Sequence, residues 1–339
     1  MKQLRFLIAR IDRIGDVVLS TPLPREIKKK YPDSYVAVLV RHYTKDIYLN
    51  NPNVDEIITI DNADKTEKSF WNLVTEIKQY KFTHAFMLLP NEKINYTLFM
   101  SGIKYRVGVG HKLYQFLTFT KYVDRKKYIP LRHEADYCLD MIRKIGVEVE
   151  SINPEIYLTE NEKDKIRDFR KYNRQGNKIL IGINISSGNS APNLNGGEYK
   201  KLIILLKQNH DYKIAVMDNN VLPEIDNIEN VLYPNMGNSL RDSIINLASL
   251  DLLISNSTGP MHICAALSVP TVSLFCPLTA CSPKLWGPLG NKSEIIMPAQ
   301  IYCDTKCPID PKKCDYSKEG GITAEEVAFK VDKFLNDLR

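Results

Sequence analysis

Short apolar strands alternate with amphipathic helices along most of this chain, and this alternation limits the fold more than any other feature. Residues 4–9, 36–40 and 54–60 have the composition of buried strands, and a helix over 17–30 separates the first two. Strands that alternate with helices in this way pair in parallel as βαβ units. The first half is therefore predicted to be a Rossmann-like, doubly wound α/β domain.

The remaining expected elements repeat this pattern, with a second βα series beginning at residue 178. The other expected strands are 85–89, 105–109, 156–158, 178–183, 213–217, 252–254 and 271–275, and the other expected helices are 70–79, 133–145, 160–172, 198–208, 240–249, a segment around 265–267 and 323–338. A chain of 339 residues is long enough for two such domains. We predict domains at 1–160 and 161–321 and a terminal helix at 322–339. The polar, turn-rich residues 173–177 are typical of the neighbourhood of a junction.

Composition narrows the class of protein. Hydrophobic residues make up 44% and charged residues 25%, as in soluble globular proteins. No apolar run approaches the roughly 20 residues that span a bilayer, and the first residues lack the pattern of a signal peptide, which predicts a cytoplasmic protein. A net charge of +6 suits an anionic membrane surface or a phosphorylated acceptor, and it is too small and scattered to indicate nucleic acid.

Two loops that follow expected strands are candidate anion-binding sites. Residues 255–262 stand between a strand and a helix, with Ser257 or Thr258 as the N-cap, Gly259 as a flexible residue and Pro260 in the first turn. Such a helix start favours a phosphate, although an ordinary strand–helix turn has the same residues. In the other loop, hydroxyls and backbone N–H groups predict an anion-binding concavity, or a plain turn, at Ser186, Ser187, Gly188 and Asn189.

Together the two loops are predicted to clamp a diphosphate. His262 is placed to protonate or hydrogen-bond a phosphate, while most single histidines near a helix start are structural. The predicted donor-binding residues are Ser186, Ser187, Gly188, Ser257, Thr258, Gly259, Pro260, Met261 and His262.

Asp16 is the candidate general base. It follows the first strand and Gly15, where a doubly wound sheet exposes its ligand-facing loops. A carboxylate there can take the proton of an acceptor hydroxyl as that hydroxyl attacks a sugar carbon, and the alternative is an Asp that caps the next helix. Nearby basic residues are candidates for holding an anionic acceptor, or form a solvated surface: Arg10, Arg13, Arg106, His111, Lys112, Arg125, Lys126 and Lys127.

Two other kinds of site are less well supported. The turn after the first strand has one glycine where a dinucleotide fingerprint needs three. Cys303-x3-Cys307-x6-Cys314, with Cys276 or Cys281 as a fourth ligand, suggests a metal, but the spacing is not that of a zinc ribbon. We expect ordinary reduced thiols and predict no metal ligand.

Several ordered motifs resemble glycosyltransferase family 9, the ADP-heptose:lipopolysaccharide heptosyltransferases. The resemblance begins at Arg10-x-Asp12-x-Ile14-Gly15-Asp16-Val17-x-Leu19-x-x-Pro22 and continues at residues 51–57 and 106–108. It then includes Asn256-Ser257-Thr258-Gly259-Pro260-Met261-His262, Trp286-Gly287-Pro288-Leu289-Gly290 and the Cys-rich stretch before residue 322. It covers nearly the whole chain.

The resemblance implies a GT-B fold, in which two Rossmann-like domains face a central cleft. It implies that the N-terminal domain binds the acceptor, that the C-terminal domain binds the nucleotide sugar, and that the last helix packs back on the first domain. It also implies an inverting, metal-independent enzyme without a cofactor. Asp16 is then the general base, and Thr258, Gly259 and His262 lie against the donor diphosphate.

This chain departs from the family pattern at two positions. Ser257 stands where many heptosyltransferases carry an Asp, and residues 191–195 lack their phosphate-binding Lys. We expect transfer of a sugar, heptose from ADP-heptose, to lipopolysaccharide core or a related anionic glycolipid or glycan, with peripheral contact at the inner membrane and no nucleic acid partner. The alternatives are a non-catalytic or differently specific nucleotide-sugar-binding protein, and a Rossmann-type nucleotide-sugar oxidoreductase or epimerase.

Overall fold

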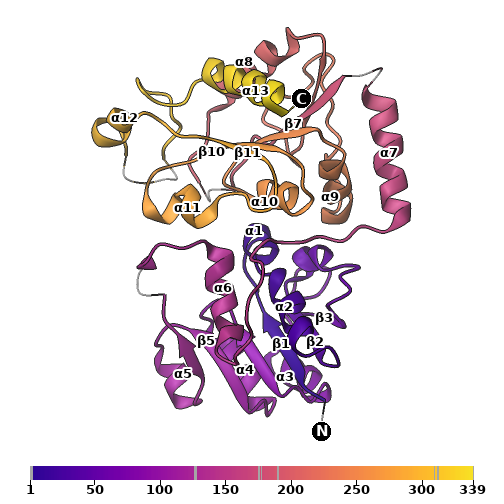
Figure 1. The fold of residues 1–339 in the computed structure, drawn as a ribbon, viewed down its shortest axis with the longest axis vertical. Helices are drawn as coiled ribbons and strands as arrows, with labels where there is room; N and C mark the ends of the chain where they lie inside the picture. The colour runs from indigo at the N-terminus through magenta and orange to yellow at the C-terminus, as the bar shows by residue number, and fades with distance from the viewer. Residues whose placement is uncertain are drawn as a thin grey trace. The chain divides into compact units, whose positions relative to one another are not determined.

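The computed structural model describes residues 3–125, 128–174, 176, 178–188, 191–308, 310 and 313–338. The chain divides into an N-terminal unit, Met1–Tyr157, and a C-terminal unit, Leu158–Arg339, each an α/β unit with its own parallel sheet (Figure 1). Within the described ranges, no helix is both long and apolar enough to cross a membrane.

The N-terminal sheet is parallel throughout, in the order β3-β2-β1-β4-β5-β6. Its strands are β1 (Arg5–Ala9), β2 (Tyr35–Val40), β3 (Glu56–Thr59), β4 (His84–Met87), β5 (Tyr105–Val109) and β6 (Lys121–Val123). Its helices are α1 (Ile14–Val18), α2 (Pro22–Lys30), η1 (His42–Ile47), α3 (Phe70–Gln79), α4 (Glu92–Met100), α5 (Leu113–Leu117) and α6 (Glu134–Arg143). Phe6, Leu7 and Ile8 of β1 are all fully buried, as expected for a strand covered on both faces.

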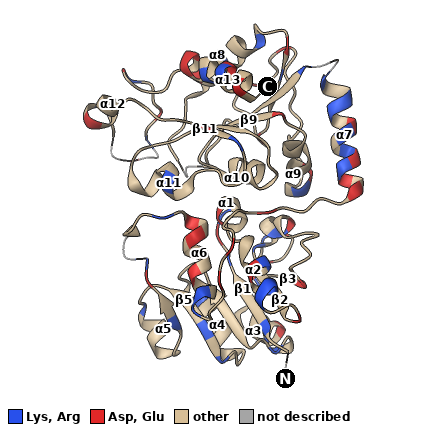
Figure 2. Ribbon diagram, in the orientation of Figure 1, with Lys and Arg blue, Asp and Glu red and all other residues tan. Residues whose placement is uncertain are grey.

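The C-terminal sheet is also parallel, in the order β11-β10-β9-β7-β8. Its strands are β7 (Ile179–Ile183), β8 (Tyr212–Val216), β9 (Leu252–Asn256), β10 (Thr271–Leu274) and β11 (Ser293–Ile296). Its helices are α7 (Glu160–Arg174), α8 (Gly196–Lys207), α9 (Leu240–Ala248), α10 (Gly259–Ala266), η3 (Thr279–Cys281), α11 (Pro283–Trp286), α12 (Gln300–Thr305) and α13 (Ala324–Leu338). Figure 2 shows charges along α7 and none on α10, whose residues lie mostly in the core.

Strand order reverses once in each sheet, and such reversals are where open α/β sheets commonly bind ligands. In the N-terminal sheet, chain order turns back between the neighbours β1 and β4; in the C-terminal sheet, it does so between β7 and β9. Loops diverge at such a point, so the carboxyl ends of the two strands open a crevice. Asp16 follows β1, Ser186 follows β7 and Ser257 follows β9, so the predicted sites lie at these edges of their own sheets.

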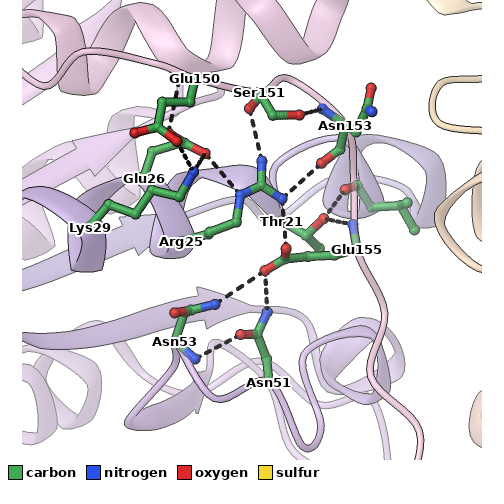
Figure 3. Close-up of polar contacts among 11 residues, drawn as sticks. Thr21, Arg25, Glu26, Lys29, Asn51, Asn53, Glu150, Ser151, Asn153 and Glu155 are labelled. Atoms are coloured by element: carbon green, nitrogen blue, oxygen red, sulfur yellow. Dashed lines mark hydrogen bonds and ion pairs between the residues drawn. The ribbon is translucent and has the colours of Figure 1, made fainter. Parts of the chain in front are cut away.

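The chain leaves the N-terminal unit just before residue 158, held there by a polar cluster on α2 (Figure 3). Arg25 donates to Glu155 Oε2 at 2.6 Å and to the carbonyls of Ser151 and Asn153. Thr21 Oγ1 accepts from the backbone N–H of Glu155 at 2.9 Å. These bonds tie residues 151–155 to α2, so the unit ends near the expected residue 160. Residues 173–177, of which 175 and 177 lie outside the described residues, fall within the C-terminal unit, and residues 173 and 174 form the end of α7.

The terminal helix α13 packs within the C-terminal unit. Val327, Val331 and Leu335 lie in the C-terminal core with Leu202 of α8, and Lys201 pairs with Glu325 at 2.6 Å. Its expected contact with the first domain stays a prediction. One expected element is wrong. Residues 156–158 form no strand, because they belong to the extended segment that links the two units.

Candidate active site

A buried guanidinium organises the loop after β1. Arg10 is 2% exposed, and its Nε lies 2.8 Å from Asp12 Oδ1. Its Nη2 donates to Asp16 Oδ1 at 2.5 Å, and its Nη1 lies 3.2 Å from Glu134 Oε1. A buried cation needs compensating charge and hydrogen bonds. Arg10 therefore fixes three carboxylates at the carboxyl end of β1, with Asp16 the candidate base among them.

A second guanidinium extends this network. Glu134 is the first residue of α6 and is 1% exposed, and Arg125 Nη1 donates to its two carboxylate oxygens at 2.9 and 2.8 Å. Arg125 was predicted to hold an acceptor, but its guanidinium is engaged by Glu134. The network holds three carboxylates and two guanidiniums. We call Arg10, Asp12, Asp16, Arg125 and Glu134 the β1 charge cluster.

Asp16 does not cap the helix that contains it. Arg13 is the N-cap of α1, and Asp16 is the third residue of that helix, with its side chain 18% exposed. Burial raises the pKa of the neighbouring Asp12 to about 6. The positive charge of Arg10 opposes this rise, and the negative charge of Asp16 adds to it. The cluster thus places a partly accessible carboxylate beside one that takes up a proton near pH 6.

The other predicted basic residues are spread over the N-terminal unit. Arg13 is exposed at the start of α1, and His111 and Lys112 are exposed after β5. Arg106 is 7% exposed, and its guanidinium donates to the carbonyls of Ile103 and Thr118. These bonds involve both terminal nitrogens of the guanidinium, and the role of Arg106 as an acceptor ligand stays a prediction. Lys126 and Lys127 lie outside the described residues.

In the C-terminal unit, a buried carboxylate shapes the loop after β7. Asp218, at the end of β8, accepts from the backbone N–H groups of Ile185 at 2.7 Å and Ser186 at 3.0 Å, and from Asn184 Nδ2 at 2.8 Å. Burial raises the pKa of Asp218 and these hydrogen bonds oppose the rise. The N–H groups expected to meet a ligand there are thus partly used by Asp218. Gly188 follows with φ +53°, a left-handed conformation that glycine adopts without strain.

Hydroxyl and amide groups join the loops after β7 and β9. Thr258 Oγ1 donates to Asn184 Oδ1 at 3.0 Å, and Ser255 Oγ lies 3.2 Å from the same oxygen. Asn256 Nδ2 donates to the hydroxyl of Tyr199 at 2.8 Å. These hydrogen bonds join uncharged groups and hold the two loops together. We call Asn184, Ser255, Asn256 and Thr258, together with Asp218, the β7–β9 amide cluster.

The start of α10 has no side-chain cap. Thr258 is the N-cap but makes no side-chain capping bond, because its hydroxyl is turned to Asn184. Ser257, Gly259 and Pro260 are half-buried at this turn. Met261 and His262 are buried at 0% and 3% exposure, and their contact with a donor stays a prediction. The turn is a helix N-terminus suited to a phosphate.

A cavity of about 340 Å³ lies beside the β7 loop. Ser186, Ser187 and Gly188 line it together with Asn193 and, from the Cys-rich stretch, Lys313. The predicted loop of Ser186 and Ser187 thus lines a cavity. Lys313, which the sequence pattern did not indicate, also lines it. Among the described residues, no group of three or more His, Cys, Asp and Glu side chains is placed to hold a metal.

Sequence reasoning missed four of these residues. Asp218 directly follows a buried strand, which is a usable signal, and Asp12 and Glu134 are ordinary first-turn or loop carboxylates until the fold brings them to Arg10. Lys313 gave no signal, because it lies 127 residues from Ser186 and in an irregular segment.

Known proteins with the same pattern support an assignment. The model of the family described as Glycosyltransferase family 9 (heptosyltransferase) matches residues 71–312. A provisionally named glycosyltransferase of Haemophilus influenzae is 27% identical over 86% of this chain and 88% of its own length. Lipopolysaccharide heptosyltransferase 2 of Escherichia coli is 21% identical over the same shares.

Two solved structures have the same fold. A glycosyl transferase family 9 protein from Veillonella parvula aligns with a TM-score of 0.79 and 23% identity over 99% of both chains. The E. coli heptosyltransferase WaaC with ADP aligns with a TM-score of 0.69 and 15% identity, over 98% of this chain and 100% of that one.

Proposed function

Because the chain belongs to glycosyltransferase family 9, the heptosyltransferases, we propose that it transfers heptose from ADP-heptose to lipopolysaccharide core or a related anionic glycan, inverting the anomeric carbon. It is a glycosyltransferase with the GT-B fold. The name of the E. coli relative supports the acceptor class, and the WaaC structure with ADP supports the donor. This assignment leaves the oxidoreductase, epimerase and non-catalytic alternatives without support.

The single observation that carries the proposal is the β7–β9 amide cluster at the reversal of strand order. It holds the start of α10 rigidly while leaving that turn without a side-chain cap. A diphosphate bound there receives backbone N–H groups and the positive end of the α10 dipole. Lys313 supplies a cation beside the β7 loop and takes the place of the Lys missing from residues 191–195. Both features stabilise the charge that the leaving ADP acquires.

Asp16 acts on the acceptor. Its carboxylate takes the proton of the acceptor hydroxyl while that oxygen forms a bond to the anomeric carbon. The bond from the anomeric carbon to the diphosphate oxygen breaks in the same displacement, and ADP leaves with the electron pair. Arg10 holds the Asp16 carboxylate at 2.5 Å and keeps it oriented during the transfer.

The remaining partners follow from the family. Arg13, His111 and Lys112 are exposed cations suited to an anionic acceptor, whether glycolipid or free glycan. We place the enzyme at the cytoplasmic face of the inner membrane, in peripheral contact with it. No metal, cofactor or nucleic acid enters this proposal.

The test is transfer from ADP-heptose to a purified lipopolysaccharide core acceptor, with the product's anomeric configuration read by NMR. We expect inversion, and we expect Asp16→Ala to lower kcat by about 10²–10⁴-fold. Asp33→Ala removes an exposed carboxylate of the same unit and serves as the control. Equal turnover by wild type and Asp16→Ala would show that another group is the base. Absence of transfer from every nucleotide sugar tried would reject the enzyme assignment.

A further inference from the structure

Large apolar side chains are exposed to solvent on and around helix α5 of the N-terminal unit. Leu113, Phe116 and Phe119 are 74%, 78% and 84% exposed, and Leu117 and Tyr122 are about half exposed. We call these five residues the α5 surface. Single exposed apolar side chains are common, but a contiguous group of large ones marks an interaction site.

The α5 surface is built with its polar side chains inside. Gln115 and Thr118 are buried at 2% and 1% exposure. Gln115 Nε2 donates to the carbonyl of Val109 at 3.0 Å, and Asn95 Nδ2 donates to Thr118 Oγ1 at 2.8 Å. Thr120 Oγ1 donates to Asn95 Oδ1 at 3.0 Å. These buried hydrogen bonds fix which side of α5 faces the interior, and the apolar side chains of α5 are therefore exposed to solvent.

The backbone holds Phe119 in an uncommon conformation. Its φ is +54°, in the left-handed region that large side chains rarely enter. Such strain persists where the surrounding structure enforces it, and here it turns an aromatic ring to solvent.

Cations border this surface. A cavity of about 550 Å³ is lined by Leu113, Phe116, Phe119 and Tyr122 together with the basic side chains of Lys112 and Lys121. Figure 2 shows the uncharged helix α5 with basic residues beside it. His111 is exposed next to Lys112 and packs on the ring of Tyr122 at 3.8 Å between centroids.

We propose that the α5 surface docks the protein on an anionic lipid bilayer. Leu113, Phe116 and Phe119 enter the boundary between headgroups and acyl chains, and Lys112 and Lys121 pair with lipid phosphates. Apolar and aromatic side chains beside a basic rim are what an anionic interface binds. A second copy of this chain fits less well, because it meets the rim with the same positive charge. The inference rests on the proposed function for its purpose, since a glycolipid acceptor lies in a membrane.

The test is flotation of the full chain with vesicles, with neither ADP-heptose nor acceptor present, so that it is independent of transfer. We expect binding to phosphatidylethanolamine–phosphatidylglycerol vesicles, weakened by salt, and little binding to phosphatidylcholine vesicles. Phe116→Glu with Phe119→Glu is expected to reduce partitioning by at least about tenfold. The matched control is Phe329→Glu on α13, an equally large ring that is 67% exposed in the C-terminal unit.

Each other result counts against the proposal. Absence of wild-type binding to the phosphatidylethanolamine–phosphatidylglycerol vesicles overturns it, as does an equal loss of binding with Phe329→Glu. A dimer that Phe116→Glu dissociates in the absence of lipid shows that the surface is an interface between copies. Should the double variant fail to fold, hydrogen exchange on the wild type decides: anionic vesicles must protect residues 113–122 and leave α13 unchanged. Transfer to a water-soluble acceptor fragment is expected to be equal in wild type and the double variant.

Discussion

The two candidate sites lie at equivalent edges of two parallel sheets, but one is built mainly from charged side chains and the other mainly from neutral ones. The β1 charge cluster joins three carboxylates and two guanidiniums around Arg10. The β7–β9 amide cluster is made of amides and hydroxyls around a single carboxylate, Asp218. A site that must accept a proton needs ionised groups held against one another, because neighbours tune their pKa values. A site that must receive a dianion needs neutral donors that add no negative charge of their own.

The comparison predicts that breaking the charged cluster costs more stability than breaking the neutral one. Glu134→Ala removes the carboxylate between Arg10 and Arg125 and leaves the buried Arg10 and the half-buried Arg125 without it. We expect a loss of roughly 3–5 kcal/mol in the free energy of unfolding, measured by urea denaturation. Glu150→Ala, which removes an exposed carboxylate paired with Lys29, is expected to cost less than about 1 kcal/mol. Similar losses for the two variants would mean that burial does not set the strength of the cluster.

The second prediction concerns the proton on Asp12. Its folded pKa of about 6 lies above the usual value, so between about pH 6 and pH 4 the folded state binds a proton that the unfolded state does not. Protonation of Asp12 therefore adds stability as pH falls through this window, and that contribution is lost as pH rises above about 6. Asp12→Asn cannot take up the proton. We expect its stability relative to wild type to fall by roughly 2–3 kcal/mol between pH 7 and pH 4.

The measurement is the difference between two urea titrations, wild type and Asp12→Asn, at each pH. Taking the difference removes the titration of every other group that the substitution leaves alone. A difference that stays constant from pH 7 to pH 4 would mean that Asp12 is ionised throughout and that burial does not dominate its environment.

The third prediction concerns Lys313, which lies beside the β7–β9 amide cluster. Lys313→Ala removes the cation at the edge of the β7 cavity without touching the amides. We expect a loss of about tenfold in affinity for ADP, close to 1.4 kcal/mol, with an unchanged melting temperature because the side chain is exposed. Lys318→Ala, exposed on the same segment, is the control. Titration calorimetry with ADP decides, and unaltered affinity would remove Lys313 from the diphosphate site.

Strand and helix periodicity predicted both parallel sheets, because buried strands and amphipathic helices are local patterns. The same periodicity could not tell which partner covers an apolar face. In α13, Val327, Val331 and Leu335 lie in the C-terminal core with residues of α8, a partner that helical spacing alone does not specify. In α5 the apolar spacing of Leu113, Phe116 and Leu117 resembles a core face, and the buried Gln115 turns it outward.

The candidate sites divide in the same way. Asp16, Ser186 and Thr258 could be predicted as candidates because they follow strands in chain order, where a doubly wound sheet presents its loops. The sequence did not reveal that Arg106 is buried and donates to the carbonyls of residues 103 and 118, because a sequence does not show where carbonyls point. Glu134 was missed because it lies 124 residues from the guanidinium that it neutralises. Long-range pairing of charges is the part that the fold alone reveals.

The smallest predicted effect separates rigidity from charge in the β7–β9 amide cluster. Thr258→Val keeps the shape of the side chain and removes the hydroxyl that donates to Asn184 at 3.0 Å. We expect a loss of about 1 kcal/mol in stability and a few-fold rise in KM for ADP-heptose, because the start of α10 is held less firmly. The control Thr305→Val removes a hydroxyl that bonds only to its own helix, at 2.6 Å from the carbonyl of Ile301. If Thr258→Val lowers stability without changing KM, the hydroxyl serves the fold alone, and the turn before α10 is rigid enough without it.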